Sequence, residues 1–357
     1  MSGVMDSTGA VSGILGTTVG TPAAGFNSST FLDQGTLFSR ASANTLNIPD
    51  LGGKVDGTIV EITATTKALG TEASWDRISV TDWRTASNRA GKDFYVYLLK
   101  AGGVILTDAS TYPYGSDADN SRKIAGFHCL CTAAGTISGH TLTGYAQGDI
   151  LPQSVWDLYN RPISTPEGMV LSLDGMWIDI YLPSVATVLV SANGGTIADG
   201  GSSPAFHCYK FEQWFGEIGK KLIRQTEFVV ASLGSNQGTN ISGTADPVTT
   251  GGHSDTAGRR MISNIGCEDM CGAIFEWSRD PGGGQSSGSS WAIAYDGNDD
   301  SEIRGHDQYA PYRAKLGGAW NDGSSCGSRL AVWSASPLYV SSYVSGRGVS
   351  EPAGNRL

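Results

Sequence analysis

The abundance and placement of glycine constrain the fold of this chain more than any other sequence feature. The 357 residues include 49 glycines, and Ser, Thr, Asp and Asn gather around them in short clusters that separate brief apolar stretches. Each cluster predicts a turn, and the runs between the turns have the length of β-strands. A hydrophobic content of 39% with 16% charged residues is enough to bury cores, so the sequence argues against global disorder and for two or three domains.

Charge and hydropathy restrict the partners of the chain. The net charge of -10 argues against nucleic acid as a partner, because phosphate contacts rely on Lys and Arg. No run of about 18 apolar residues occurs, which argues against insertion into a membrane. Residues 1–20 contain no Lys or Arg and so lack the basic region of a secretory signal. Synthesis in a reducing cytoplasm, with the six cysteines mostly free, is the simpler assumption, and a Cys267–Cys271 disulfide stays open.

Three regions follow one another along the chain. Residues 1–50, rich in Gly, Ser, Thr and Ala, are expected to form short strands of an assembly arm, and residues 51–147 an all-β domain. The strand-like runs in that domain are 58–63, 94–99 and 104–107. From residue 148 onwards the pattern changes. Two further strand-like runs, 169–173 and 176–182, are separated by Asp174-Gly175, which is a strong hairpin signal.

Two helices are expected in the third region. Apolar residues at helical spacing predict the first over residues 209–222, namely Phe211, Trp214, Phe215, Ile218 and Leu222. The second is expected from Thr226 to about Leu233, with Gly234 at its carboxyl end. Helices early in the region and loop-linked strands late in it indicate an α+β domain over residues 148–357, preceded by the all-β amino-terminal region.

Three motifs in this last region resemble a known protein family. They are residues 148–162, residues 246–277, which end in Cys-Glu-Asp-Met-Cys-Gly-Ala-Ile-Phe-Glu-Trp, and residues 317–329, Gly-Gly-Ala-Trp-Asn-Asp-Gly-Ser-Ser-Cys-Gly-Ser-Arg. In this order they resemble the major tropism determinants of phages and related variable proteins of diversity-generating retroelements. The resemblance implies a C-type lectin fold, a homotrimer, and a place in the virion at the tip of a tail fibre, or at the cell surface for a cellular relative. It also implies binding of a host cell-surface protein or glycan.

The resemblance further implies that residues 319–344 are diversified, by changes at the adenines of AAC codons. Such changes yield Asn, Asp, Ser, Tyr, Val or Ala, and ten positions that match the family pattern carry these residue types: Asn321, Asp322, Ser325, Val332, Ser334, Ala335, Tyr339, Ser341, Ser342 and Tyr343. We expect these side chains to face solvent and to bind the ligand, with tyrosine supplying contact area at low entropic cost. The expected scaffold that fixes the backbone beneath them includes Trp277, Trp320, Arg329, Trp333 and Arg347.

Two other functions stay open at this point. A structural virion or adhesin protein without a diversified site needs no binding surface. The same motifs also resemble the scaffold of formylglycine-generating enzymes, which use two nearby thiols. Cys326 fits one of these places, whereas Asn321 occupies the other. Because the pair of soft ligands that copper requires is incomplete, we expect that the protein is not an enzyme.

Evidence for metals and cofactors is weak in the sequence. Asp296, Asp299 and Asp300 offer hard oxygen ligands, so calcium is the one cofactor left open, against the alternative of a solvated acidic loop. The cysteines near histidines, such as Cys129 and Cys208, lack a CxxC pair with a matching distant pair. They are therefore interpreted as buried core thiols.

Overall fold

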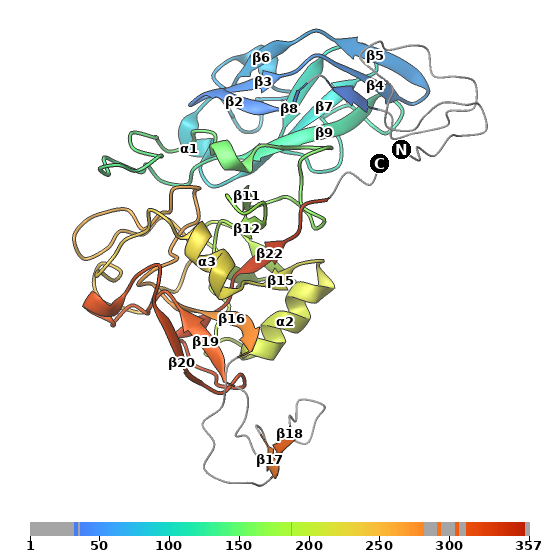
Figure 1. Ribbon diagram of the computed structural model, residues 1–357. Helices are drawn as coiled ribbons and strands as arrows, with labels where there is room; N and C mark the ends of the chain where they lie inside the picture. Colours follow the sequence, from blue (N-terminus) through green and yellow to red (C-terminus); the bar gives the residue numbers. More distant parts are fainter. Residues whose placement is uncertain are drawn as a thin grey trace, which may run out of the picture. The chain divides into compact units, whose positions relative to one another are not determined.

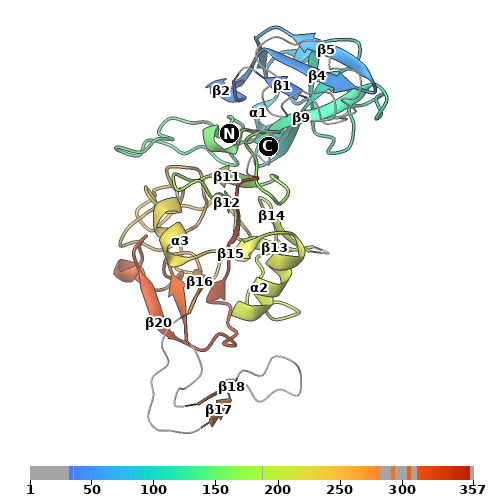
Figure 2. The ribbon, with the colours of Figure 1, turned by 45° about the vertical axis from the view of Figure 1, so that its right-hand side comes forward.

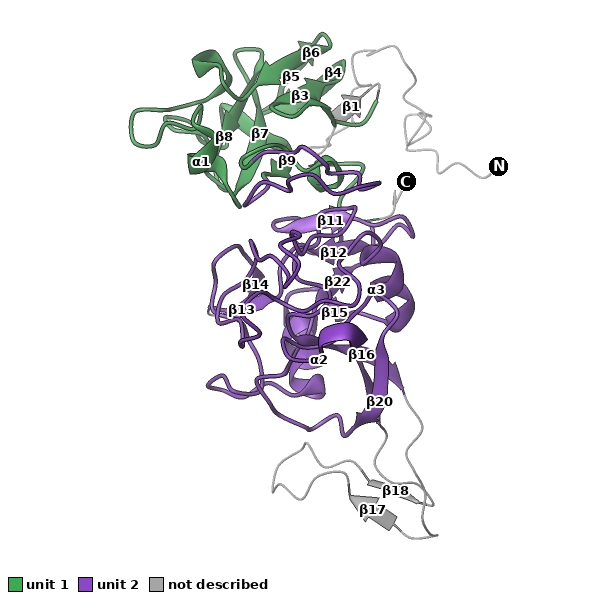
Figure 3. Ribbon diagram, turned by 90° about the vertical axis from the view of Figure 1, so that its left-hand side faces the viewer, with its two compact units in different colours: residues 1–129, 147–161, 353–357 green, residues 130–146, 162–352 purple. Residues whose placement is uncertain are grey.

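The computed structural model describes residues 32–34, 36–186, 188–281, 291–293, 304–306 and 312–353. Short strands predominate and helices are few among these residues, as the glycine pattern predicts (Figure 1). The described chain divides into two compact units (Figure 3). The first comprises the residues up to 129, residues 147–161 and residue 353, and the second comprises residues 130–146 and 162–352. No helix within the described ranges is long and apolar enough to cross a membrane.

The first unit is built from three antiparallel sheets around one apolar core. Their orders are β1-β4-β5, β2-β3-β6 and β10-β9-β7-β8. The strands are β1 (Leu32–Gln34), β2 (Ser39–Ser42), β3 (Thr45–Ile48), β4 (Leu51–Val55), β5 (Thr58–Ile62), β6 (Thr65–Ala68), β7 (Asp93–Leu99), β8 (Val104–Thr107), β9 (Ser121–His128) and β10 (Trp156–Asp157). Single turns of helix are η1 (Glu72–Ser74), α1 (Ala86–Arg89) and η2 (Pro152–Ser154). All three expected strand runs are present in this unit.

Pairing between strands places the unit boundaries differently from the sequence pattern. β3 pairs with β6 and β1 pairs with β4, so the described part of the expected arm, residues 1–50, shares sheets with the following domain. The expected boundary at residue 148 also differs, because β10 returns to the first unit to pair with β9. At Gly126 of β9 an added Cβ would lie 2.6 Å from the Trp156 ring, so glycine permits this close packing.

The second unit contains two four-stranded sheets and both longer helices. The sheet orders are β11-β12-β22-β15 and β20-β19-β16-β21, and two-stranded sheets are formed by β13-β14 and by β17-β18. The elements are β11 (Met169–Leu171), β12 (Trp177–Asp179), β13 (Pro183–Val185), β14 (Leu189–Ser191), α2 (Cys208–Glu217), β15 (Lys221–Leu222), α3 (Gln225–Ala231), β16 (Phe275–Pro281), β17 (Trp291–Ile293), β18 (Arg304–His306), β19 (Arg313–Leu316), η3 (Gly323–Ser325), β20 (Ala331–Ala335), β21 (Val344–Ser345) and β22 (Gly348–Ser350). Figure 2 shows β15 and β16 between α2 and α3.

The predicted hairpin and helices are present, with shorter bounds. β11 and β12 pair antiparallel across Asp174-Gly175, where Gly175 has φ +84°. α2 ends five residues before the predicted end at Leu222. The reason is Gly219, whose φ of +72° terminates the helix, so that Lys221 and Leu222 join a sheet instead.

A buried ion pair lies at the centre of the second unit. The Arg347 guanidinium and the Glu276 carboxylate are both fully buried and 2.7 Å apart. The remaining donors of Arg347 bond to the carbonyl oxygens of Asp179, Ile180 and Glu268 at 2.8–2.9 Å. The glycines on either side of Arg347 allow close packing, because a Cβ at residue 348 would lie 2.3 Å from the Asp179 carboxylate. Arg347 therefore joins β22, β12, β16 and the loop before β16.

We predict that Arg347→Met lowers the free energy of unfolding by about 3–5 kcal/mol, because it leaves the Glu276 charge buried and unpaired. Arg329→Met is the matched control, since Arg329 is exposed. It should change stability by less than about 0.5 kcal/mol. Urea denaturation followed by circular dichroism measures both variants, and equal stability of the two would contradict the assignment of Arg347 to the core.

Candidate functional site

The expected variable residues lie on three segments near the carboxyl end of the second unit. The first runs from Asn321 through η3, the second is β20, and the third is the loop of residues 339–343 before β21. Backbone hydrogen bonds hold the third segment in place. Cys208, the first residue of α2, donates to the Pro337 carbonyl at 2.8 Å, and Gly200 donates to the Ser341 carbonyl at 3.1 Å. Backbone groups therefore anchor this loop, and the Ser341 hydroxyl also accepts the Tyr343 amide at 3.2 Å.

Trp320 connects the first and third segments. Its ring stacks on the Tyr343 ring with centroids 4.8 Å apart, and it packs against three apolar clusters of the unit. Its carbonyl accepts a hydrogen bond from the Asn240 amide. Beside the stacked rings, Asn321 Nδ2 donates to the Tyr343 hydroxyl at 3.4 Å. Trp277 and Arg347, two further residues expected in the scaffold, are fully buried.

Nine of the ten expected variable side chains reach the surface wholly or in part. Asn321, Ser325, Ser334 and Tyr339 are exposed, and Asp322, Val332, Ser341, Ser342 and Tyr343 are half-buried. Ala335 is the exception because its side chain is buried, at 7% exposure. The outward orientation expected for Ala335 therefore differs from the structure.

A β-bulge explains the orientation of Ala335. In the pairing of β20 with β19, Val332 lies opposite Lys315 and Ala335 lies opposite Arg313, so β20 has one extra residue in this stretch. Such a bulge interrupts the alternation of inward and outward side chains. As a result Trp333 and Ser334 are both exposed, and Ala335 turns into the apolar core.

Two expected scaffold residues lie at the surface instead. Trp333 is 41% exposed, because the bulge turns it outward, and so it does not fix the backbone by burial. Arg329 is also exposed and forms no hydrogen bond or ion pair with any residue in the described ranges. Sequence reasoning left Trp333 out of the contact surface because an AAC codon cannot yield Trp by changes at its adenines. Trp333 nevertheless lies exposed beside Ser334 on β20.

An aromatic and cationic patch forms where the second and third segments meet. Tyr339 is 44% exposed, and the Lys315 ammonium lies 5.3 Å from the centre of its ring. Lys315 belongs to β19 and pairs with Val332 of β20, which places Tyr339 next to the exposed part of β20. A large exposed aromatic residue fixed on an ordered backbone is typical of binding surfaces.

Cys326, the one thiol at a position that oxidase chemistry would use, is poorly suited to that chemistry. The Cys326 side chain is buried, its thiol contacts the Ala319 carbonyl oxygen at 3.5 Å, and burial raises its pKa to about 11. A protonated thiol is a weak ligand for a soft metal. Among the described residues no group of three or more His, Cys, Asp or Glu could hold a metal ion. The calcium candidates Asp296, Asp299 and Asp300 lie outside the described residues.

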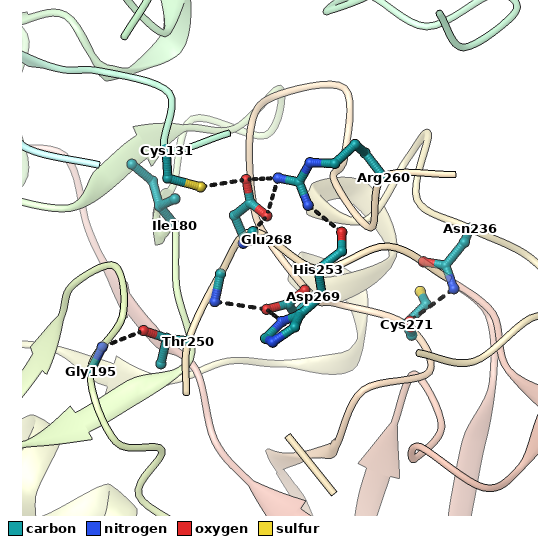
Figure 4. Close-up of polar contacts among 12 residues, drawn as sticks. Cys131, Ile180, Gly195, Asn236, Thr250, His253, Arg260, Glu268, Asp269 and Cys271 are labelled. Carbon is teal, nitrogen blue, oxygen red and sulfur yellow. Dashed lines mark hydrogen bonds and ion pairs between the residues drawn. The ribbon is translucent and has the colours of Figure 1, made fainter. Parts of the chain in front are cut away.

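A second polar cluster lies inside the unit, in the loop before β16 (Figure 4). Arg260 Nη2 donates to both carboxylate oxygens of Glu268, at 2.7 and 2.8 Å, and Cys131 donates to the same carboxylate. Next to it, His253 Nδ1 lies 2.8 Å from an Asp269 carboxylate oxygen. Glu268 and Asp269 also accept backbone amides from the Gly251-Gly252 turn. These contacts hold the loop together, and burial keeps the Cys131 thiol protonated by raising its pKa.

Solved structures with the same fold are known. The Major Tropism Determinant M1 variant matches with a TM-score of 0.74 and 25% identity, covering 91% of this chain and 86% of that chain. The U1 variant matches with a TM-score of 0.73 over the same shares. In addition, residues 42–157 match the family model of the Mtd second domain. The β-rich fold is thus that of the Major Tropism Determinants.

A relative from Bordetella phage BPP-1, a tail fiber receptor-binding protein, is 31% identical over 282 residues, or 73% of this chain and 71% of the relative. This protein therefore belongs to the family of phage tail fibre receptor-binding proteins that the Major Tropism Determinants represent. The family resemblance seen in the carboxyl-terminal motifs is confirmed, and the match to the Mtd second domain extends it to the first unit.

The bulge in β20 predicts that two neighbouring positions differ in how well they accept a large side chain. Ser334→Tyr should change the free energy of unfolding by less than about 0.5 kcal/mol, because the side chain is exposed. Ala335→Tyr should lower it by about 1–3 kcal/mol or more, because the ring would overpack a buried site. Thermal unfolding of the two variants compares them directly. Equal tolerance of tyrosine at both positions would show that Ala335 faces solvent.

The His253–Asp269 pair predicts a loss of stability as pH rises through the folded-state pKa of His253. Burial disfavours the imidazolium, but the hydrogen bond and charge of Asp269 outweigh this effect and raise the pKa of His253. The pair therefore stabilises the fold fully below the unfolded-state pKa of about 6.5, and this contribution is lost as pH rises through the folded-state pKa. The difference in melting temperature between the wild type and His253→Gln should shrink as pH rises through that range.

His140 supplies a control, because its contribution to stability changes with pH in the opposite direction. Burial lowers the pKa of His140, so the stability it contributes should be lost as pH falls below about 6.5. The difference between the wild type and His140→Gln should therefore grow as pH rises. If both variants followed the same pH dependence, the assignment of a charged His253 would be wrong.

Proposed function

We propose that this protein is a receptor-binding, tropism-determining protein at the tip of a phage tail fibre, and that it binds a host cell-surface protein or glycan through its carboxyl-terminal surface. Kinship with the tail fiber receptor-binding protein of Bordetella phage BPP-1 supports this function. The observation that carries the choice of surface is the exposure of Tyr339 and Trp333 on an ordered backbone. Exposed aromatic residues of this kind dominate the energetics of recognition.

We further propose that the carboxyl-terminal domain is a C-type lectin fold and that its surface is diversified at nine positions: Asn321, Asp322, Ser325, Val332, Ser334, Tyr339, Ser341, Ser342 and Tyr343. Their full or partial exposure supports this set. Substitution at exposed positions changes stability little, so a changing surface is compatible with a constant fold. Trp320 and Arg347 stabilise the framework beneath that surface.

The proposal extends to assembly and location. A homotrimer in the virion would present several copies of one weak surface, and such multivalency raises the total affinity. The two alternatives have less support. A purely structural virion or adhesin protein gives no role to the exposed Trp333 and Tyr339, and an oxidase requires a reactive thiol where Cys326 is buried. We therefore assign no enzymatic activity to the protein.

Attachment of the purified protein to host cells tests this function. Tyr339→Ala should weaken attachment at least about fivefold, because loss of a central tyrosine contact costs more than about 1 kcal/mol. The melting temperature should stay unchanged, because the side chain is exposed. Flow cytometry with labelled protein measures the attachment. Tyr114→Ala is the matched control, since Tyr114 is an exposed tyrosine of the first unit, at 67% exposure.

Two results would contradict the proposed function. Failure of the wild-type protein to attach to any cell that the phage infects would remove the receptor-binding role. Equal attachment by Tyr339→Ala and the wild type would contradict the assignment of the binding surface but not the receptor-binding role.

A further inference from the structure

A polar pocket of about 640 Å³ lies in the second unit, next to the variable segment. Its walls come from four parts of the chain: residues 137–140, residues 233–237 after α3, the loop that carries Arg259 and Asn264, and Ser328 with Arg329. Arg329 follows η3 by four residues and so continues the segment that carries Asn321 and Ser325. The pocket is thus distinct from the patch around Tyr339 but belongs to the same carboxyl-terminal region.

The charge of the pocket is opposite to that of the protein as a whole. The chain has a net charge of -10, yet two arginines and neither Asp nor Glu line this pocket. Arg329 is exposed and has no hydrogen bond or ion pair among the described residues. Arg259 Nη2 donates to the Gly234 carbonyl, whereas Nη1 is buried and has no partner in the described part of the chain.

The nearby carboxylate of Asp255 does not neutralise this guanidinium by direct contact. Asp255 Oδ1 instead accepts the backbone amides of Ala257 and Arg259, each at 2.9 Å. Arg259 is half-buried, and burial lowers the pKa of its guanidinium while the charge of Asp255 opposes this effect. A guanidinium with a buried, unpartnered nitrogen is stabilised by an anion that bonds to that nitrogen.

The walls of the pocket are fixed before any ligand binds. Gln237 holds Ser328 from both sides, donating to its hydroxyl at 3.0 Å and accepting its amide at 3.2 Å. Asn264 Oδ1 accepts the Thr141 amide at 3.3 Å, which attaches the 137–140 wall to the arginine loop. His140 is held by bonds at both ring nitrogens, to the Ile262 carbonyl and the Leu142 amide. Because these walls are set, binding would cost little conformational entropy.

We propose that this pocket binds an acidic sugar, with Arg259 and Arg329 holding its oxyanion and the hydroxyl and amide groups around them contacting its hydroxyls. Guanidinium groups bind carboxylate and phosphate oxygens through charge-assisted hydrogen bonds. Ser138, Ser328 and Asn264 supply the neutral polar groups that suit a sugar ring. This inference rests on the proposed function, since it specifies a chemical group of the host surface that the protein would contact.

Calorimetric titration of the full chain tests the pocket without cells. The probes are glucuronate for a sugar carboxylate, a hexose phosphate for a sugar phosphate, and methyl glucoside and inorganic phosphate as the neutral sugar and the bare anion. We expect saturable binding of at least one acidic sugar and weaker binding of both comparison probes. The acidic sugar with the lower Kd shows whether the pocket prefers a carboxylate or a phosphate. Binding of inorganic phosphate as tight as that of the hexose phosphate would overturn the sugar assignment.

Arg329→Gln is the decisive variant, because its side chain is exposed and its loss should leave the fold intact. We expect it to raise the Kd for the acidic sugar at least about tenfold, the loss expected for one charged hydrogen bond. Arg259→Gln should do the same, and thermal unfolding reports whether it remains folded. Lys221→Gln is the control of equal charge change outside the pocket, and its Kd should match the wild type. A Kd unchanged in Arg329→Gln overturns the proposal.

Failure of this inference differs from failure of the proposed function. If the wild type attaches to host cells but binds no acidic sugar, the assignment of the pocket is wrong and the receptor-binding role is unaffected. If the wild type binds the sugar through Arg329 but attaches to no host cell, the pocket is a sugar-binding site and the proposed receptor-binding role is wrong.

Discussion

The Arg347–Glu276 ion pair is the interaction on which the second unit depends. One guanidinium, fully buried, bonds to a carboxylate of β16 and to three backbone carbonyls of other segments. Its five donors are fixed in one plane, so the segments that accept from them are held in one arrangement. A buried pair of this kind contributes less to net stability than its Coulomb energy suggests, but removal of one partner is costly. The pair thereby connects β16 and β12 to the glycines that precede and begin β22.

This rigid interior separates stability from recognition in the second unit. Inside the unit Arg347 pairs with Glu276 and Arg260 pairs with Glu268, and Trp320 packs against apolar clusters. The segments that carry Tyr339 and Ser334 are held mainly by backbone hydrogen bonds and strand pairing. A surface whose backbone is held independently of its side chains can change without unfolding the protein. Position 335 is an exception to this tolerance of substitution, because the bulge in β20 turns Ala335 inward.

Two chemically different surfaces lie in the carboxyl-terminal region. The patch with Tyr339 and Trp333 offers aromatic area, whereas the pocket with Arg259 and Arg329 offers positive charge in an acidic protein. Aromatic contacts adapt to many partners, and a pair of guanidinium groups selects for anions.

The sequence by itself determined the local elements and the family. The Asp174-Gly175 turn, the bounds of β8 and the apolar spacing in α2 follow from nearest neighbours, and the carboxyl-terminal motifs indicate the family. Tertiary structure decided the rest. The bulge that exposes Trp333 depends on pairing with β19, and the joining of Arg259 to Arg329 in one pocket depends on how distant loops pack. Contacts between residues far apart in the chain leave no periodic pattern, so local propensity could not predict them.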